Sequence, residues 1–455
     1  MTASTAFPEL LAFRSQLHGS FTRRGDALFE LADAMLTADA IASPPHLSLE
    51  PGHRRGWGSV YAALARGRIN AAACQRAICR SLLPGAWPVF AVDVSTWPRC
   101  DAEASPERGF YYHPVYHPSR HSAGQPIVAG WAYQWITQLS PARDSWTAPV
   151  DARRIHPTAN ANQAAATQIS DLVRMLPGGP SPLFVFDAGY DPVQLGPGLA
   201  GTRAAVLVRL RSGRCCYADP PPAPPGRVGR PRRHGAKLDT SDPATWPAPS
   251  ATLTAADTQY GQISVQTWAG LHPKQQLHAT RGTKQPRPIV RGTLVRVHVA
   301  RLPTRTRPPK VLWLWWHGPG HPDLELLWRA YIRRFDLEHT LRFVKQTLGW
   351  TTPRVRSPEQ ADRWTWLVVA AYTQLRLARA GATDQRLPWE RPRPPGRLSP
   401  LRVRRGSPKL LLSVGTPASA PKPCGRSPGR PKGRRSGPAP RYPAIKKRQL
   451  TSTNS

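Results

Sequence analysis

The chain has 455 residues, with 63 Lys and Arg against 27 Asp and Glu, and a formal net charge of +36 at pH 7. That length predicts two or three domains, and a hydrophobic fraction of 40% is enough for a sizeable core. A positive charge of this size argues against an enzyme of small metabolites. It favours a polyanionic partner, above all nucleic acid.

Membrane insertion and secretion are not expected. The sequence contains no run of 18 apolar residues, so we expect no transmembrane helix and no membrane partner. Its first residues lack the basic stretch followed by an apolar stretch that typifies a secretory signal. The six cysteines form no Cys-x-x-Cys pair, which argues against a zinc site or a disulfide framework and favours a cytoplasmic location.

Residues 1–85 are predicted to be mostly helical, because apolar residues recur there at helical spacing. Residues 58–83 could form two short helices that turn at Gly67. Such a pair is either a helix-turn-helix that faces DNA or an ordinary hairpin with a solvated basic face. The basic residues of this pair are Arg66, Arg68, Arg76 and Arg80.

Residues 86–210 change to short apolar runs that predict buried strands. These runs lie at 88–95, 109–117, 130–140, 181–191 and 201–211, with one helical stretch at 161–176. Strands, then a helix, then further strands predict the first part of an α/β core with a mixed sheet.

Residues 211–310 are predicted to be an insertion rich in β structure. It begins with a proline cluster at 220–225 and a basic run at 226–237, and segments 260–270 and 292–302 alternate as strands do. Residues 311–385 then return to the core. They contain a last strand at 311–318, a long helix at 321–350 and a helix from Ser357, its predicted N-cap, with Gln360 completing a capping box.

The tail, residues 386–455, is predicted to be disordered. From Arg391 onward it holds 17 Lys and Arg, 13 Pro and no acidic residue, so it lacks the apolar residues of a core. Its Gly-Arg-Pro segment resembles the core of an AT-hook, an extended strand that enters a narrow minor groove. The alternative is a basic linker that contacts phosphates at any sequence. The candidate DNA-binding residues of the tail are Arg430, Arg434 and Arg435.

Acidic residues are scarce, so their positions are informative. Asp93 follows the apolar run Phe90–Val92, Asp187 follows Leu183–Phe186, and Glu338 lies in the helix predicted at 321–350. A carboxylate against an apolar strand is costly unless it is paired or bound to a metal. Brought together, these three would bind two Mg²⁺ ions, for which Mn²⁺ can substitute, and catalyse phosphoryl transfer. Singly, each could instead cap a loop or face solvent.

The same predicted helix carries the pattern Tyr-x2-Arg-x3-Glu-x6-Lys, formed by Tyr331, Arg334, Glu338 and Lys345. Offsets of three, four and seven residues place all four on one helical face. A basic and phenolic stripe beside a metal-binding carboxylate would hold a phosphodiester backbone. The alternative is a surface helix in which Arg334 and Glu338 form an i,i+4 ion pair.

With these motifs the chain resembles the DDE transposases of bacterial insertion sequences, in the branch with this Tyr-Arg-Glu-Lys signature. The resemblance covers roughly residues 85–380 and includes the motif Asp187-Ala188-Gly189-Tyr190. It implies a ribonuclease H-like core with a β-rich insertion between the second Asp and the Glu. The 151 residues from Asp187 to Glu338 have room for such an insertion.

The resemblance also implies an activity. Asp93, Asp187 and Glu338 would be the catalytic and metal-binding residues, with Mg²⁺ as cofactor, while Tyr331, Arg334 and Lys345 would hold terminal phosphates. The enzyme would cut the ends of its own insertion sequence, in some members through a DNA hairpin, and join the 3′-OH ends to target DNA. An insertion tryptophan often stacks on a flipped base in the family; the candidates here are Trp268, Trp313, Trp315 and Trp316.

The expected partners are double-stranded DNA, both the terminal inverted repeats and the target, and a second copy of the chain. A homodimer or higher oligomer follows from the need to bring two ends together. The expected location is the bacterial cytoplasm, at the nucleoid when DNA is bound. Two alternatives remain: a domesticated, non-catalytic DNA-binding protein with a transposase fold, and a ribonuclease H-like nuclease that cuts without joining.

Overall fold

The computed structural model describes residues 7–446, apart from 84–87, 113–126, 143, 223, 227, 230–231, 275–276, 281–282, 287–288, 303–310, 395, 424–428, 430–432 and 434–436. The fold is mixed α/β, as the sequence predicts. Its contacts divide it into two units, which we call the helical unit (Met1–Pro84, Val94–Ala159 and Asp336–Ser455) and the sheet unit (Gly85–Asp93 and Asn160–Phe335). None of the helices described is both long and apolar enough to cross a bilayer.

The helical unit begins with the helices predicted within residues 1–85. They are separated by a 3-10 turn, η2 (Pro44–Leu49), and by a short two-stranded sheet of β1 (Phe21–Arg23) and β2 (Arg68–Ile69). Between the last two helices the chain turns at Gly67, where a Cβ would lie only 2.3 Å from the Ala63 carbonyl oxygen. The helices are α1 (Pro8–Ser20), α2 (Gly25–Thr37), α3 (Trp57–Arg66) and α4 (Ala71–Arg80).

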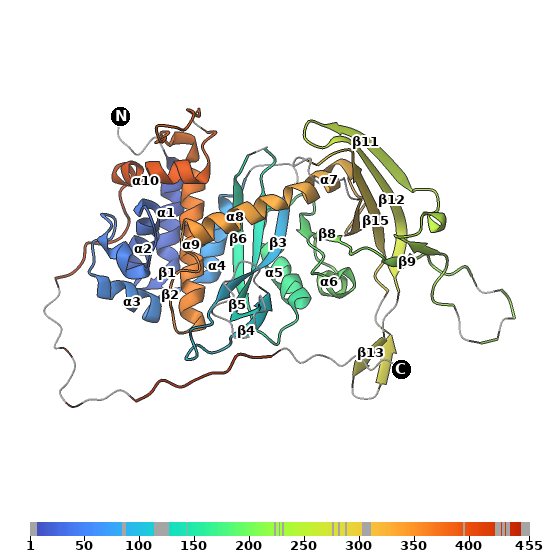
Figure 1. The fold of residues 1–455 in the computed structure, drawn as a ribbon, viewed down its shortest axis with the longest axis horizontal. Helices are drawn as coiled ribbons and strands as arrows, with labels where there is room; N and C mark the ends of the chain where they lie inside the picture. Colours follow the sequence, from blue (N-terminus) through green and yellow to red (C-terminus); the bar gives the residue numbers. More distant parts are fainter. Residues whose placement is uncertain are drawn as a thin grey trace. The chain divides into compact units, whose positions relative to one another are not determined.

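The centre of this unit is helix α9 (Pro358–Ala378), which packs against α1 to α4 (Figure 1). Its start is as predicted: Ser357 is the N-cap and Gln360 completes a capping box. Most of its side chains are buried, which explains the mainly apolar sequence Trp364–Tyr372. A 3-10 turn, η5 (Arg379–Gly381), ends it.

Four strands also belong to the helical unit, wholly or in part. They are the second half of β3 (Val89–Pro98), then β4 (Gly109–Tyr112), β5 (Ile127–Leu139) and β6 (Thr147–Ile155). β5 pairs antiparallel with both β4 and β6. Aromatic rings from β3 and β5 surround the fully buried Trp350, whose ring centroid lies 6.0 Å from Trp97, 5.6 Å from Tyr133 and 4.9 Å from Trp135.

Part of the tail predicted to be disordered is a helix, α10 (Pro400–Val414), which corrects that prediction for these residues. It packs against α2 and α9, and Arg404, only 6% exposed, donates to the carbonyl oxygens of Met35, Ala38 and Asp39. Composition alone does not predict this helix, because part of the surface that buries it, α2 and the residues after it, lies more than 360 positions earlier in the chain.

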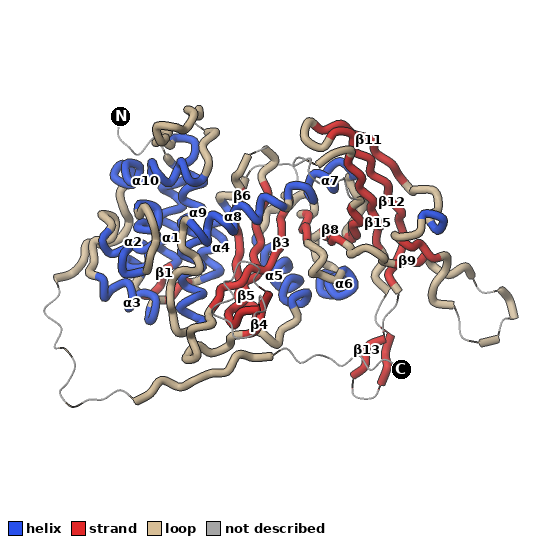
Figure 2. The backbone as a smooth tube through the Cα atoms, in the orientation of Figure 1, coloured by secondary structure: helices blue, strands red, loops and turns tan. Residues whose placement is uncertain are grey.

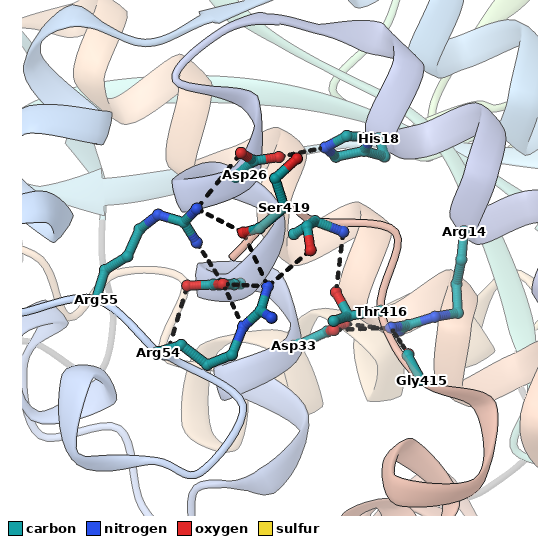
Figure 3. A network of polar contacts seen from close by, with 11 residues as sticks. Arg14, His18, Asp26, Asp33, Arg54, Arg55, Gly415, Thr416 and Ser419 are labelled. Carbon is teal, nitrogen blue, oxygen red and sulfur yellow. Dashed lines mark hydrogen bonds and ion pairs between the residues drawn. The ribbon is translucent and has the colours of Figure 1, made fainter. Parts of the chain in front are cut away.

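The segment after α10 is bound to the N-terminal helices through its main chain (Figure 3). Three arginines, each paired with acidic residues of α2, donate to its carbonyl oxygens: Arg14 to Gly415, Arg54 to Ala418 and Ser419, and Arg55 to Ser419. Their acidic partners are Asp26, Glu30 and Asp33. The arginines therefore bind main-chain carbonyl oxygens of residues 415–419, and the C-terminal segment packs as part of the N-terminal helical region.

The sheet unit is built on one continuous sheet (Figure 2). Within this unit the strand order is β10-β9-β12-β15-β16-β8-β7-β3, in which β8, β7 and β3 are parallel to one another, and β3 also pairs with β5. The parallel group consists of β3, β7 (Leu183–Phe186) and β8 (Ala205–Arg209), whose inner positions are buried and apolar. Helix α5 (Ala161–Met175) leads into β7 and α6 (Pro192–Leu199) connects β7 to β8; the two helices pack against each other.

Most strands of the sheet unit fall within residues 211–310. β9 (Cys215–Tyr217), β10 (Lys237–Asp239), β12 (Gly261–Pro273) and β15 (Gly292–Val299) lead to β16 (Leu312–His317), while β11 (Ala251–Asp257) pairs with β12. A 3-10 turn, η4 (Pro243–Thr245), precedes β11, and β13 (Leu277–Thr280) forms a separate hairpin with β14 (Thr283–Pro286). The domain boundaries predicted from the sequence stay predictions.

The helix predicted at 321–350 is divided at Arg334. The first part is α7 (Leu324–Arg333), which Asp323 caps, and the second is α8 (Phe335–Gln346). Arg334 keeps right-handed helical angles, φ −53° and ψ −30°, so the chain changes helix without leaving the helical region. The four signature residues therefore lie on two helices and the junction between them, and their placement on one helical face stays a prediction.

Candidate active site

Asp93 and Asp187 lie side by side at the carboxyl end of the parallel strands. β3 and β7 pair in parallel with Val92 opposite Phe186, and each aspartate is the next residue along its strand. The apolar residues before them are fully buried, so both carboxylates stand at the border between core and solvent. β3 continues to Pro98, so Asp93 marks the end of its pairing with β7 and not the end of the strand.

The loop after β7 fixes how Asp187 is presented. Its Oδ1 accepts a hydrogen bond of 2.9 Å from the Gly189 amide. A Cβ at residue 189 would lie 3.0 Å from that oxygen, so glycine allows the tight turn. Oδ2 remains directed to the site, with the Asp187 side chain 41% exposed. This geometry gives a physical reason for the Asp-Ala-Gly sequence.

Arg334 connects the two carboxylates. Its Nη2 lies 3.0 Å from Oδ2 of Asp93 and 3.8 Å from Oδ2 of Asp187, so the two oxygens are no farther apart than the sum of these distances. The Arg334 side chain is 10% exposed and that of Asp93 is 20% exposed. A mostly buried guanidinium thus carries a positive charge to the point where the two acidic residues meet.

Tyr190 is a buried residue next to the two carboxylates. It is 7% exposed, and its ring packs against Phe186 at a centroid distance of 4.8 Å. Burial raises the pKa of the Tyr190 hydroxyl well above its usual value, and the negative charges of Asp93 and Asp187 raise it further. Tyr190 therefore stays neutral beside the carboxylates.

Two arginines at and just after the end of the neighbouring strand β8 extend the site, and neither was among the residues predicted from the sequence. Phe186 of β7 is paired with Val208 of β8, and the next residues along the two chains are Asp187 and Arg209. Arg209 therefore lies beside Asp187 at the same end of the parallel strands. The Arg209 guanidinium hydrogen-bonds to Tyr331, whose hydroxyl pKa is nevertheless raised because the side chain is largely buried. Arg211 Nε donates to the Ala188 carbonyl oxygen at 3.3 Å. The available signal was a charged residue directly after each of three adjacent apolar strands.

Glu338 and Lys345 belong to the helical unit. Glu338 is exposed in the first turn of α8. Lys345 is in the last turn, with its Nζ 5.9 Å from the ring centroid of Trp350. The sheet unit brings Asp93, Asp187, Tyr331 and Arg334 together, and the membership of Glu338 and Lys345 in the same site stays a prediction.

The residues at the strand ends fit a hard divalent cation. Two aspartate oxygens converge on one cationic group, and carboxylate oxygens are the ligands that Mg²⁺ and Mn²⁺ prefer. Among the residues the structure describes, no three His, Cys, Asp or Glu side chains are grouped closely enough to hold a metal ion. A complete site therefore needs a third carboxylate or the oxygens of a substrate beside Asp93 and Asp187.

The remaining sequence candidates divide into two groups. Arg430, Arg434 and Arg435 lie outside the described residues. The tryptophans proposed to stack on a base are buried, with exposures of 3% for Trp268, 8% for Trp313, 0% for Trp315 and 7% for Trp316. Three of them pack in one apolar cluster with Leu294, so they form core and offer no open ring face.

The chain is thus a mixed α/β protein whose two strand-end aspartates share one arginine. Residues 16–274, more than half of the chain, match the family model of the DDE superfamily endonucleases, and the chain belongs to that family. The match includes Asp93 and Asp187 and ends before α7. No curated protein sequence matches the chain. Among solved structures it is similar to a piggyBac transposase synaptic complex with hairpin DNA, with 10% identity and a TM-score of 0.41 over 86% of this chain and 71% of that chain.

Proposed function

We propose that this DDE endonuclease is a transposase of a bacterial insertion sequence, in the branch with the Tyr-Arg-Glu-Lys signature. It cuts both ends of its own element and joins the 3′-OH ends to target DNA. The observation that carries the proposal is the pair Asp93 and Asp187 at the ends of adjacent parallel strands, bridged by the signature residue Arg334. This ion pair connects Asp187, in the Asp-Ala-Gly-Tyr motif, with Arg334 of the signature segment, 147 positions later in the chain.

The proposed chemistry divides the work between carboxylates and cations. Asp93 and Asp187, with Glu338 as the third carboxylate, hold two Mg²⁺ ions, for which Mn²⁺ can substitute. When bound, the metal lowers the pKa of an attacking water or 3′-OH and stabilises the leaving oxygen. Tyr331, Arg334 and Lys345, joined by Arg209, orient the terminal phosphates, because guanidinium groups match the geometry of phosphate oxygens.

The proposed partners follow from this chemistry. Double-stranded DNA, as terminal inverted repeats and as target, meets a protein with a net charge of +36. Two ends must be cut together, so the active form is a dimer or a higher oligomer. The core is proposed to be ribonuclease H-like, with the strands of 211–310 as its insertion. The proposed location is the bacterial cytoplasm.

A plasmid cleavage assay tests the proposal. Purified protein is incubated with a supercoiled plasmid that carries the gene's own flanking ends, in Mg²⁺, Mn²⁺ or Ca²⁺. Glu338→Gln should abolish cleavage at the ends. Glu325→Gln, at a half-buried residue of α7 that pairs with Arg329, should cleave like the wild type. Cleavage by Glu338→Gln at the wild-type rate would remove Glu338 from the site.

The competing candidate is a domesticated, non-catalytic DNA-binding protein. The scaffold of paired aspartates would survive in such a protein, and DNA would bind without being cut. Specific binding to the flanking ends with no cleavage by the wild type in Mg²⁺ or Mn²⁺ would favour this candidate. Cleavage without any joined product when target DNA is present would favour a nuclease that only cuts.

A further inference from the structure

Arg334 lies where a divalent ion would have to approach the two aspartates. Its Nη2 is 3.0 Å from Oδ2 of Asp93 and within 3.8 Å of Oδ2 of Asp187. The Arg334 side chain is 10% exposed, so solvent screens its charge only weakly. Each of these two oxygens therefore already faces a positive charge before any metal arrives.

A metal ion and this guanidinium compete for the same two oxygens. Two positive charges a few ångströms apart in a weakly solvated site repel each other strongly. Leaving Asp93, whose side chain is 20% exposed, without a cation is also costly, so the apo site favours the state with Arg334 in place. Binding of a metal to both carboxylates requires the guanidinium to move away from them.

A phosphate group offers Arg334 another partner. Its oxygens accept the paired N–H donors of a guanidinium as well as a carboxylate does. Arg209 and Arg211 already place positive charge next to Asp187, where a phosphodiester would be attracted. A DNA phosphate arriving here would draw Arg334 away from the aspartates and leave their oxygens to the metal.

We propose that Arg334 is a resident counter-ion of Asp93 and Asp187 that keeps the metal affinity low until DNA is bound. This inference rests on the proposed function and deepens it, because it makes metal loading depend on substrate. By linkage, DNA must raise the affinity for metal by the same factor by which metal raises the affinity for DNA. A transposase without DNA would then hold its metal site closed by its own side chain.

Direct measurement of Mn²⁺ binding to the full-length protein tests this inference without any need for activity. Free Mn²⁺ is followed by electron paramagnetic resonance, with and without a short 5′-phosphorylated duplex. Asp93→Asn supplies the background of binding elsewhere. The variants are Arg334→Ala, Arg334→Lys and, as a matched control on α7, Arg329→Ala, which removes an equal charge from an arginine paired with Glu325.

We expect Arg334→Ala to bind Mn²⁺ about tenfold or more tightly than the wild type when DNA is absent. Arg334→Lys should lie between them, because an ammonium group keeps the charge but cannot span both carboxylates. Arg329→Ala should bind Mn²⁺ like the wild type. DNA should tighten Mn²⁺ binding to the wild type about tenfold and have a much smaller effect on Arg334→Ala.

Two results would overturn the inference. One is equal or weaker Mn²⁺ binding by Arg334→Ala, with circular dichroism and the thermal midpoint showing that the variant is folded. The other, which needs no variant, is Mn²⁺ affinity of the wild type that does not change when DNA binds. Either result leaves the proposed function intact if the wild type cuts the plasmid at the element's ends. If the wild type does not cut the plasmid but DNA still tightens its Mn²⁺ binding, the proposed function fails and the inference about Arg334 stands.

Discussion

The buried ion pair between Arg14 and Asp33 should make a large and measurable contribution to the stability of the helical unit. Arg14 Nη1 and Nη2 lie 2.7 and 2.8 Å from the two carboxylate oxygens of Asp33. The side chains are 2% and 5% exposed. Nη1 also bonds to Gln374 of α9, and Nη2 donates to the Gly415 carbonyl oxygen at 2.7 Å. One guanidinium thus joins α1, α2, α9 and the C-terminal segment.

We predict that Arg14→Ala lowers the free energy of unfolding by about 3–5 kcal/mol at pH 8, the range found when one partner of a buried pair is removed. The cost comes mainly from the carboxylate of Asp33, which would keep its burial and lose its counter-charge. Burial already raises the pKa of Asp33 above its usual value even with Arg14 present. Without the guanidinium that pKa must rise further.

The sign of the pH dependence follows from this shift. A carboxyl group whose pKa is higher in the folded state binds more protons folded than unfolded, so stability falls as the pH rises. The deficit of Arg14→Ala should therefore be smaller at pH 5, where a larger fraction of Asp33 is protonated, than at pH 8. Urea unfolding followed by tryptophan fluorescence at the two pH values measures the difference.

The double variant Arg14→Met, Asp33→Leu is the control. It removes both charges and fills the space with apolar groups, an exchange that is often close to neutral in protein cores. The Gly415 carbonyl oxygen still loses its donor, at about 1–3 kcal/mol, so the double variant should be more stable than Arg14→Ala but less stable than the wild type. If Arg14→Ala unfolds at the wild-type urea midpoint at pH 8, Asp33 is not buried as described and the reasoning fails.

Two further predictions concern the same unit. Gly130→Ala should lower the thermal midpoint by several degrees, because a Cβ there would lie 2.3 Å from the Trp97 carbonyl oxygen. Gly437→Ala, a control in the same unit whose Cβ would meet open space, should leave the midpoint unchanged. Equal midpoints for the two variants would contradict the close approach of β5 to the β3 backbone. Ending the chain after Val414 should also lower the thermal midpoint, because three arginines of the N-terminal region then lose the carbonyl oxygens to which they donate. Ending the chain after Ala420 keeps these carbonyl oxygens and is the control. Calorimetry on both truncations decides the point, and identical midpoints would show that residues 415–419 do not brace the N-terminal helices.

Local patterns allowed much of this fold to be predicted. The apolar run Leu183–Phe186 is β7, and the Ser357 and Gln360 signals start α9 as predicted, because buried strands and capping boxes are encoded over a few neighbouring residues. Strand β6 (Thr147–Ile155) was not predicted, since Asp151, Arg153 and Arg154 break its apolar alternation. Asp151 is fully buried there and is stabilised by Arg153 and by Gln75, a partner 76 residues away.

The candidate site was predicted in part. Scarcity of acidic residues singled out Asp93 and Asp187, and the structure brings both to Arg334. The break at Arg334 was not predictable from spacing, because every residue of the stretch is compatible with one continuous helix. Arg209 was passed over because arginine is abundant in this chain, and only the register of β8 against β7 distinguishes it.

The helical unit is assembled from three separate stretches of chain, and this has a consequence for biosynthesis. Helices α1 to α4 leave the ribosome early, yet the helix that fills their centre, α9, begins only at Pro358. The sheet unit, by contrast, needs little beyond the continuous stretch Asn160–Phe335. During translation the first helices must therefore wait with their apolar faces uncovered while the later unit is made. A nascent chain stalled before α9 would expose these faces to chaperones and proteases, so the N-terminal region reaches its folded form only when the protein is nearly complete.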